Sequence, residues 1–336
     1  MRFILPLTIA VAIIIPSAAL AQFMGGAGDD TSAAVTQSFT ASISPQYPAP
    51  YSQATLLVLS STLDLTNATM AVSVNGKGIY QGSVQSLAIP LGKAGSMTSV
   101  QVTIASNGTS SLQTLSIQPE DVALVAEPVS SAPPLYPGKP LVPLEGETRV
   151  VAVANLQDAN GKAVDPSTLS YAWTVDDTQI ADSSGIGKDA IMVDSPLEYR
   201  SSTVSVAVQS QDGTLVGGDT LTLTASEPSV QIYENDPLLG ILFDHALSGN
   251  YAISGAEDTL YAAPFSFPTS SGAPLLQWFL NGDAAQTGNS ITLRPTGSGQ
   301  GTASLSLAAS AGESTRADEE LSLSFSAAPS NGLFGL

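Results

Sequence analysis

The hydrophobic and polar positions of this chain alternate over short stretches that end in turn residues. The clearest stretch is residues 169–178, with the sequence Leu-Ser-Tyr-Ala-Trp-Thr-Val-Asp-Asp-Thr, and related stretches lie at 275–283 and 71–77. A period of two that stops at Asp-Asp or Asn-Gly predicts a half-buried strand running into a hairpin. Both tryptophans of the chain, Trp173 and Trp278, lie in this strand. We interpret it as the central strand of a β-sandwich that occurs three times.

Other strand patterns recur around this one, in the same order and with a period of about 100 residues. The anchor positions are Val74, Val175 and Leu280. The remaining predicted strands are an early one at 55–59, 148–154 and 259–265, a later one at 99–104, 203–208 and 302–307, and a final one at 112–117, 220–223 and 321–325. No stretch shows a sustained helical period, so the predicted class is all-β, with three tandem sandwich domains at 39–118, 119–227 and 228–327.

Turn residues separate the later and final strands. Asn107-Gly108 and Asp212-Gly213 accept positive φ at low cost, so both predict tight hairpins. In the second repeat, Trp173 is expected to pack between the two sheets, against the four valines Val151, Val153, Val204 and Val206.

Two long insertions follow the first strands of repeats two and three. Residues 127–147 contain six prolines, which exclude a central strand or a helix and predict an extended surface segment. Residues 234–258 hold the apolar run 236–243, with the sequence Asp-Pro-Leu-Leu-Gly-Ile-Leu-Phe. We expect this run to pack on its own domain or across the junction with repeat two, and the second case would stiffen the junction.

Composition narrows the range of partners. The net charge is −19, from 10 Lys and Arg against 29 Asp and Glu, and only 12% of the residues are charged. Phosphate binding needs a basic face, so a nucleic-acid partner is excluded and an anionic membrane surface is disfavoured. The chain has no cysteine, which excludes disulfides, thiolate metal sites and cysteine nucleophiles.

The N-terminus resembles a secretory signal. Residues 1–21 begin with Met-Arg, continue through an apolar run and end in Ala-Leu-Ala, which predicts a signal peptide cleaved after Ala21. An uncleaved anchor is the alternative, although the run is short for a bilayer span and contains two prolines. Residues 22–38 have the composition of a flexible linker, and no second stretch is long enough to span a membrane. The expected location is secreted or associated with the cell surface.

Repeat two carries a resemblance to a known family. Tyr171-Ala-Trp173-Thr-Val175-Asp176 and the hairpin at 201–224 resemble PKD-like and other immunoglobulin-like modules of secreted bacterial proteins. The resemblance covers about residues 39–327. It implies seven-stranded sandwiches and a secreted or surface setting, and it implies no active site. Repeat one has Val72 where the tryptophan falls, so its core is expected to be smaller.

Candidate catalytic chemistry is sparse. His245 is the single histidine, and no nucleophile-elbow pattern lies beside it, so we predict a structural or solvent-facing side chain. A zinc site built on His245 would need further histidine or cysteine ligands, and the chain has no second histidine and no cysteine. Three groups of carboxylates remain as candidates for a paired-acid glycosidase site: Asp176, Asp177, Asp182 and Asp189; Glu257 and Asp258; and Asp318, Glu319 and Glu320.

We interpret these carboxylates as solvated turn residues. There is no Asp-x-Asp-x-Asp-Gly loop, so no cofactor is expected, with a weak calcium site between modules as the alternative. Carbohydrate-binding proteins expose aromatic rings, whereas aromatics are 6% of this chain and both tryptophans occupy predicted core positions. The structural core residues are expected to be Trp173, Val175, Trp278, Leu280 and Val74.

The function that these patterns favour is a secreted or cell-surface, non-enzymatic protein of tandem sandwiches, with an adhesion, spacer or envelope-structural role toward an extracellular protein or glycan. One alternative is an accessory carbohydrate-binding or hydrolytic protein with a carboxylate-lined inter-domain site. A second is an extracellular assembly subunit. Residues 328–336 form a tail whose apolar side chains Leu333, Phe334 and Leu336 are expected to dock on a partner or on another copy.

Overall fold

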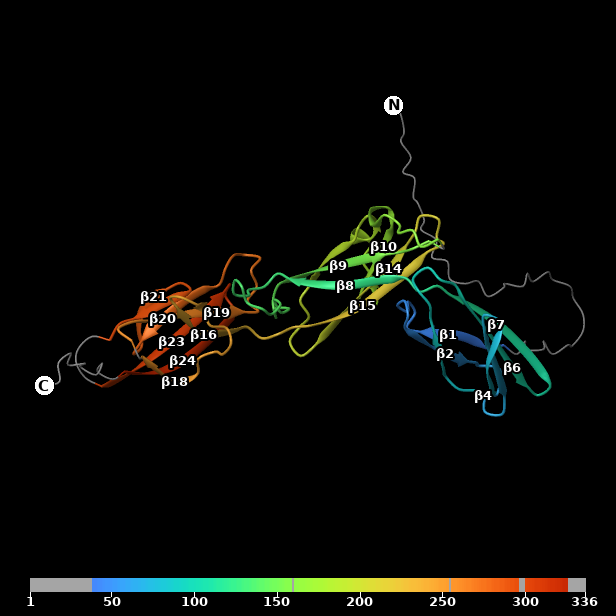
Figure 1. The fold of residues 1–336 in the computed structure, drawn as a ribbon, viewed down its shortest axis with the longest axis horizontal. Coiled ribbons are helices and arrows are strands. Elements are labelled where there is room, and N and C mark those ends of the chain that lie inside the picture. The colour runs from blue at the N-terminus through green and yellow to red at the C-terminus, as the bar shows by residue number, and fades with distance from the viewer. Residues whose placement is uncertain (1–37, 159, 254, 296–299, 326–336) are drawn as a thin grey trace, which may run out of the picture. The chain divides into compact units, whose positions relative to one another are not determined.

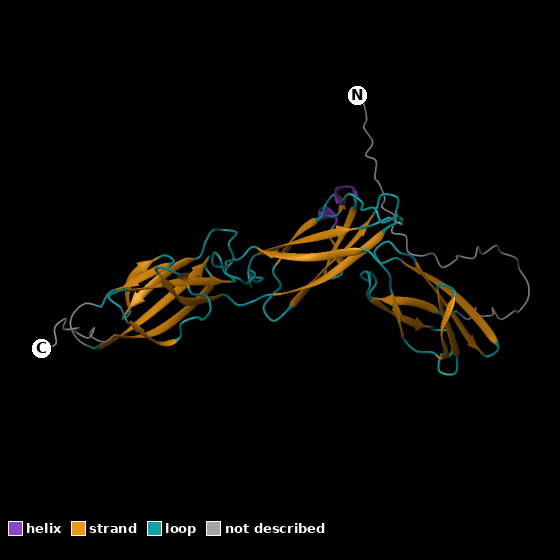
Figure 2. Cartoon of the chain, in the orientation of Figure 1, coloured by secondary structure: helices purple, strands orange, loops and turns teal. Residues whose placement is uncertain are grey.

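The computed structural model describes residues 38–158, 160–253, 255–295 and 300–325. The predicted signal peptide 1–21, nearly all of the linker 22–38 and the tail lie outside these ranges. Strands make up almost all of the regular structure, and two short 3-10 helices, Pro166–Thr168 and Ala181–Ser183, complete it (Figure 2). The all-β prediction is therefore confirmed, and the strands assemble into three successive sandwiches (Figure 1).

The first sandwich contains seven strands in two antiparallel sheets. One sheet has the order β1-β2-β5 and the other β4-β3-β6-β7. The strands are β1 (Thr40–Ser44), β2 (Gln53–Leu59), β3 (Thr69–Val74), β4 (Lys77–Ser83), β5 (Leu87–Pro90), β6 (Thr98–Ser106) and β7 (Thr109–Ile117).

The second sandwich repeats this plan. One sheet has the order β13-β9-β8, and the other has the order β11-β10-β14-β15 with β12 paired to β10. The strands are β8 (Asp121–Pro128), β9 (Glu147–Asn155), β10 (Ser170–Val175), β11 (Thr178–Gln179), β12 (Gly185–Ile186), β13 (Ala190–Asp194), β14 (Ser201–Gln209) and β15 (Val216–Thr224).

The third sandwich adds two strands to the plan. Its sheets have the orders β17-β16-β19-β22 and β18-β24-β23-β20-β21, with β18 parallel to β24. The strands are β16 (Ser229–Asp236), β17 (Gly240–Ile241), β18 (Gly249–Ile253), β19 (Asp258–Phe265), β20 (Leu275–Leu280), β21 (Asp283–Thr287), β22 (Ser290–Leu293), β23 (Gly301–Ala311) and β24 (Thr315–Phe325).

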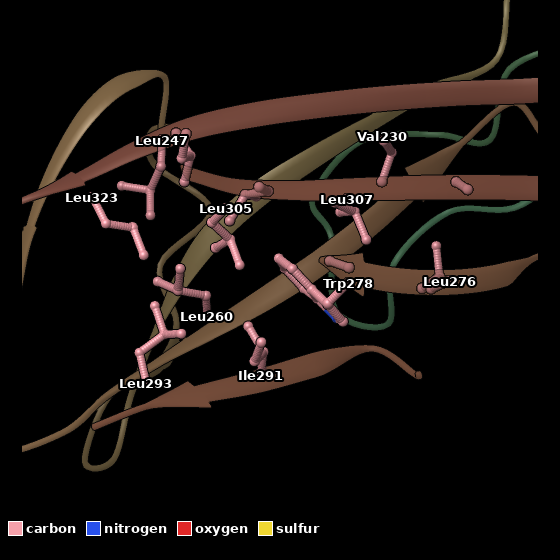
Figure 3. Close-up of a cluster of buried hydrophobic side chains, with 14 of the residues drawn as sticks. Val230, Leu247, Leu260, Leu276, Trp278, Ile291, Leu293, Leu305, Leu307 and Leu323 are labelled. Atoms are coloured by element: carbon pink, nitrogen blue, oxygen red, sulfur yellow. The ribbon is translucent and has the colours of Figure 1, made fainter. Parts of the chain in front are cut away.

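Each sandwich encloses its own apolar core between its sheets. Trp173 and Trp278 are fully buried in the second and third cores, and side chains from both sheets surround Trp278 (Figure 3). Each indole also donates its N–H to a backbone carbonyl 2.9 Å away, from Trp173 to Lys188 and from Trp278 to Gly288. Burying an indole is costly when its N–H is unpaired, so these bonds make the position suitable for tryptophan.

The packing predicted for Trp173 is half wrong. Val204 and Val206 share its buried cluster, but on β9 the inward side chains are Val150, Ala152 and Ala154. Val151 and Val153 point to the opposite face, and Val153 is 56% exposed. A shift of one residue exchanges the two faces of a strand. Because β9 contains the adjacent pair Val150-Val151, the alternation pattern alone does not determine which face is inward.

The turn after each central strand is held by the same two hydrogen bonds, which we call the Asx clasp. Asn75, Asp176 and Asn281 begin these turns, and all three have positive φ. Their backbone N–H groups donate to the carbonyls of Ser99, Thr203 and Ser304, at 2.8, 2.9 and 2.8 Å respectively. Their side-chain Oδ1 atoms accept the N–H groups of those same three residues, at 2.9, 2.7 and 2.9 Å. The clasp ties the end of the central strand to the strand beside it in every repeat.

The two predicted hairpins differ. Ser106 pairs with Thr109, and Asn107 and Gly108 between them both have positive φ, so this tight hairpin is confirmed. The hairpin at Asp212-Gly213 is wrong, because Gln209 pairs with Val216 and leaves a six-residue loop. Within that loop the Asp212 carboxylate accepts hydrogen bonds from Ser210 and Thr214, which stabilises the wider turn.

In the described ranges no helix is both long and apolar enough to cross a membrane.

Candidate functional site

The side chain of His245 lies at the surface. Its Nδ1 is 3.0 Å from Oδ2 of Asp244, and the two side chains are 61% and 72% exposed. The hydrogen bond from His245 holds the pKa of the Asp244 carboxyl below its ordinary value. No serine, threonine or lysine hydrogen-bonds to this pair in the described part of the chain. The geometry is that of a solvent-exposed hydrogen-bonded pair.

Some of the candidate carboxylates have structural roles, and others are simply exposed. Asp176 forms the Asx clasp and also accepts the Ser202 hydroxyl, and these hydrogen bonds lower its pKa. Glu257 pairs with Arg294. Glu320 accepts the Ser304 hydroxyl. Asp177, Asp182 and Asp189 are exposed on the loops around β10 and β13, and Asp258 lies near the Tyr251 hydroxyl.

The acidic run on β24 does not converge. Asp318 and Glu320 are two residues apart and share a face, whereas Glu319 points to the other side of the sheet. Burial raises the pKa of Glu319, with the Asp318 charge as a second cause. Among the residues that the structure describes, no three acidic or histidine side chains gather in a group able to hold a metal ion.

The most heavily built region outside the cores is the junction between the second and third sandwiches, formed by the proline-rich residues 129–146. Ser131 donates its backbone N–H to Phe267 at 2.8 Å and accepts the N–H of Ser266 at 3.2 Å. Its hydroxyl also accepts the N–H of Phe267 at 3.1 Å. Thr269 donates to the Val129 carbonyl. The segment thus adds a short antiparallel bridge to the chain that follows β19.

An aromatic cluster covers the outer face of β16 and β19 at this junction. Tyr136, from the proline-rich segment, lies edge-on to Phe243 and Phe265, with ring centroids 5.6 and 5.0 Å apart. Phe243 lies edge-on to Tyr233 of β16 and Tyr261 of β19, at 5.1 and 6.4 Å. Edge-to-face pairs at these distances add to the stabilisation from buried area. Of the apolar run 236–243, Ile241 and Phe243 pack on their own domain, and Phe243 also meets Tyr136 of the segment from repeat two. Leu238 and Leu239, which are 93% and 76% exposed, do not pack.

A carboxylate contributes to the same junction. Glu145 accepts the Ser314 hydroxyl at 2.6 Å and lies 3.4 Å from that of Thr315, at the start of β24. The hollow beside it has a volume of about 470 Å³, and Glu145 and Glu313 are its acidic lining residues. No aromatic ring lines this hollow. It lacks the aromatic platform expected at a carbohydrate site.

The join between the first and second sandwiches contains a buried acid. Glu120 is 4% exposed; its Oε2 accepts the Gln157 N–H at 3.0 Å, and its Oε1 has no hydrogen-bond partner among the described residues. Burial raises the pKa of this carboxyl, and the bond from Gln157 opposes the rise. Gly95 donates to the Pro119 carbonyl at the same place. The connection there is short and packed.

The structure places the predicted core residues as follows. Trp173 and Trp278 are fully buried, and Val175, Leu280 and Val74 are partly buried against the cores of their own sandwiches. The docking-tail residues Leu333, Phe334 and Leu336 lie outside the described ranges.

Sequence reasoning missed the residues that build the junction, above all Ser131 and Tyr136. A signal was present, because Leu135-Tyr136 is an apolar pair inside a proline-rich run. Extended proline-rich chain cannot pair with itself, so a large ring within it indicates packing on another surface. What the sequence does not reveal is which surface that ring meets.

Comparisons with known proteins add little to this geometry. No protein-family model matches the chain, and no characterised protein matches it in sequence. Among solved structures, it is similar to the central fibronectin-III array of RIM-binding protein, at 10% identity and a TM-score of 0.29, over 86% of this chain and 97% of the other. It is also similar to fibronectin(III)-like modules of Clostridium thermocellum CbhA, at 10% identity and a TM-score of 0.24, over 62% of this chain and 99% of the other.

An I-band fragment from titin is similar at 9% identity and a TM-score of 0.21, over 88% of this chain and 100% of the fragment. Scores this low carry no argument about function. The fold assignment rests on the strands, sheet orders and cores of the structure itself.

Proposed function

We propose that this chain is a secreted or cell-surface, non-enzymatic protein, built as modules 39–118, 119–227 and 228–327, that acts as a spacer or adhesion module. The observation that carries the proposal is the ordered junction at residues 129–146. A flexible tether would leave this segment without tertiary contacts. Here it has backbone hydrogen bonds to the third sandwich and a ring inside an aromatic cluster. Such contacts suit a protein that must hold successive modules apart under load.

The electrostatics support an extracellular role of this kind. A net charge of −19 on a chain with few basic residues keeps the surface soluble and repels other acidic surfaces. Asp176, Glu257 and Glu320 of the candidate carboxylates hold local structure, which supports a non-enzymatic role. The same proposal includes a PKD-like relationship, a bacterial origin and an extracellular protein or glycan as the partner.

Stiffness of the junction provides the test. Spin labels placed on β8 and β21, in the second and third sandwiches, should give a narrow distance distribution by double electron–electron resonance in the unaltered chain. Tyr136→Ala combined with Ser131→Gly should broaden that distribution, because both remove contacts to the third sandwich. The matched control is Tyr199→Ala, since Tyr199 is 91% exposed.

Two further results decide the proposal. Protease shaving of intact cells should remove the sandwiches, because the proposal places them outside the cell. A broad distance distribution in the unaltered chain, or sandwiches protected inside the cell, would contradict the spacer role.

A further inference from the structure

The outer face of one sheet in the second sandwich has an apolar centre whose side chains remain partly exposed. On β8, β9 and β13 the outward side chains form a contiguous block, because Val125 pairs with Val151 and Val151 with Ala190, while Ala123 pairs with Val153. Val125, Val153 and Met192 are 42%, 56% and 48% exposed. We call this block the β9 face.

The equivalent face in the third sandwich shows what such a surface takes up. There β16, β19 and β22 occupy the places of β8, β9 and β13, respectively. The outward side chains include Tyr233, Tyr261 and Ala263, which are 7%, 9% and 0% exposed. They are buried because Phe243 lies on them, with Tyr136 beside it. The segment that delivers Phe243 reads Gly240-Ile-Leu-Phe243. This face of the sheet is therefore covered by a short segment that contains a glycine, aliphatic residues and a phenylalanine.

Residues 332–336, with the sequence Gly-Leu-Phe-Gly-Leu, have the same character. They follow β24 and lie outside the described ranges. At the edges of the β9 face, Arg149 pairs with Glu127 at 2.6 Å, and Asp121, Glu147 and Asp194 are exposed. Residues 326–336 carry no charged side chain. Apolar side chains can thus approach this face without the charge repulsion expected between two acidic molecules.

Within one chain this segment is too short to reach the β9 face. Thr315, at the start of β24, lies beside Glu145 at the junction, and the strand then runs ten residues to Phe325, about 33 Å at 3.3 Å per residue. Residues 326–336 span at most about 40 Å when fully extended. Returning to the junction uses most of that length, and Val153 lies six residues along β9 from its start at Glu147, about 20 Å further. The occupant must come from another molecule.

We propose that Leu333, Phe334 and Leu336 of a second copy of this chain dock on the β9 face, as Phe243 docks on the third sandwich. The two surfaces that meet are different, so the contact is heterologous and repeats from copy to copy. The product is a head-to-tail assembly. This inference does not depend on the proposed location of the protein, because it concerns the association of the chain with itself.

The test uses the full chain, expressed without residues 1–21, in sedimentation velocity over a range of concentrations. Unaltered chain should associate as its concentration rises. Val153→Glu should abolish association, and so should the triple change of Leu333, Phe334 and Leu336 to Ser, because each removes one side of the contact. The matched control is Leu112→Glu, since Leu112 is 64% exposed on β7, and this variant should still associate.

A labelled peptide of residues 326–336 separates this contact from other modes of association. It should bind the triple-Ser chain and lose at least tenfold in affinity when Val153→Glu is added, with circular dichroism showing that both variants remain folded. Association that persists in the triple-Ser chain would identify a sheet-to-sheet dimer and overturn the proposal. A chain that stays monomeric throughout, or a peptide that binds the Val153→Glu chain equally well, would overturn it too.

Discussion

At the scale of single residues, the polar groups that first suggest chemistry are used to hold the fold. Asp176 occupies the same place as Asn75 and Asn281, and all three accept a backbone N–H from the neighbouring strand. A carboxylate and a carboxamide share this acceptor geometry, so either serves in the clasp. The difference is that the carboxylate titrates, and this makes one of the three clasps sensitive to acid.

The acid response of Asp176 is the first prediction. Hydrogen bonds from Thr203 and Ser202 lower its folded-state pKa, so its stabilising contribution is present above the unfolded pKa and is lost as the pH falls below about 4 through the folded value. Asp176→Asn should keep the clasp and remove this part of the acid dependence. The melting temperatures of both proteins between pH 2 and 7 provide the measurement, with Asp177→Asn as the control. Parallel curves for the Asp176 variant and the unaltered protein would contradict it.

Trp173 supplies a second prediction. Trp173→Ala removes a fully buried indole from the second core and should reduce the free energy of unfolding of that sandwich by roughly 3–5 kcal/mol. Val153→Ala, on the outer face of β9, should change it by no more than about 0.5 kcal/mol. Urea unfolding of the two variants measures the difference. Near-equal losses would mean that β9 presents its other face to the core.

At the scale of elements, close packing between strands places limits on side-chain size. Gly218 of β15 lies under Tyr47, and a Cβ there would come within 2.5 Å of both the Tyr47 ring and the Val206 carbonyl oxygen. Gly78 of β4 has no atom within 4 Å of the same position. Two glycines that look alike in the sequence therefore have opposite tolerance for a methyl group.

The third prediction compares these glycines. Gly218→Ala should destabilise the protein by about 1–3 kcal/mol, the usual range for overpacking. Gly78→Ala adds a methyl group in open space and should be neutral or slightly stabilising, because alanine restricts the unfolded chain. Thermal melting distinguishes the two. A Gly218 variant as stable as the Gly78 variant would show that Tyr47 moves aside freely.

At the scale of the whole molecule, three separate cores supply the stability, without cysteine and with no metal-binding group among the described residues. The fourth prediction follows from this arrangement. Adding a chelator should leave the melting temperature nearly unchanged. A metal ion stabilises a fold by binding to its native state, and the described residues contain no group that would bind one. A fall of more than about 10 °C on chelation would reveal a structural calcium site and contradict the expectation.

The sequence by itself determined the class of fold and the order of the strands. The period-two alternation at 169–175 and in its two copies reflects a local property of β-strands. Successive side chains of a strand point to opposite faces of the sheet, whatever the strand packs against. Turn residues such as Asn107-Gly108 also act locally, through backbone conformation, and that hairpin formed as predicted. The two tryptophans lie on the inward faces of their strands, as the alternation predicts, and both are fully buried.

Tertiary structure alone decided which surfaces meet. Val150 and Val151 are chemically identical neighbours, and only the position of β9 between β8 and β13 turned one inward and the other outward. The Asp212 turn widened because its carboxylate found Ser210 and Thr214. Tyr136 found Phe243 and Phe265, more than 100 residues away. Contacts between residues so far apart in the sequence form only when the chain has folded, and no local pattern of residues predicts them.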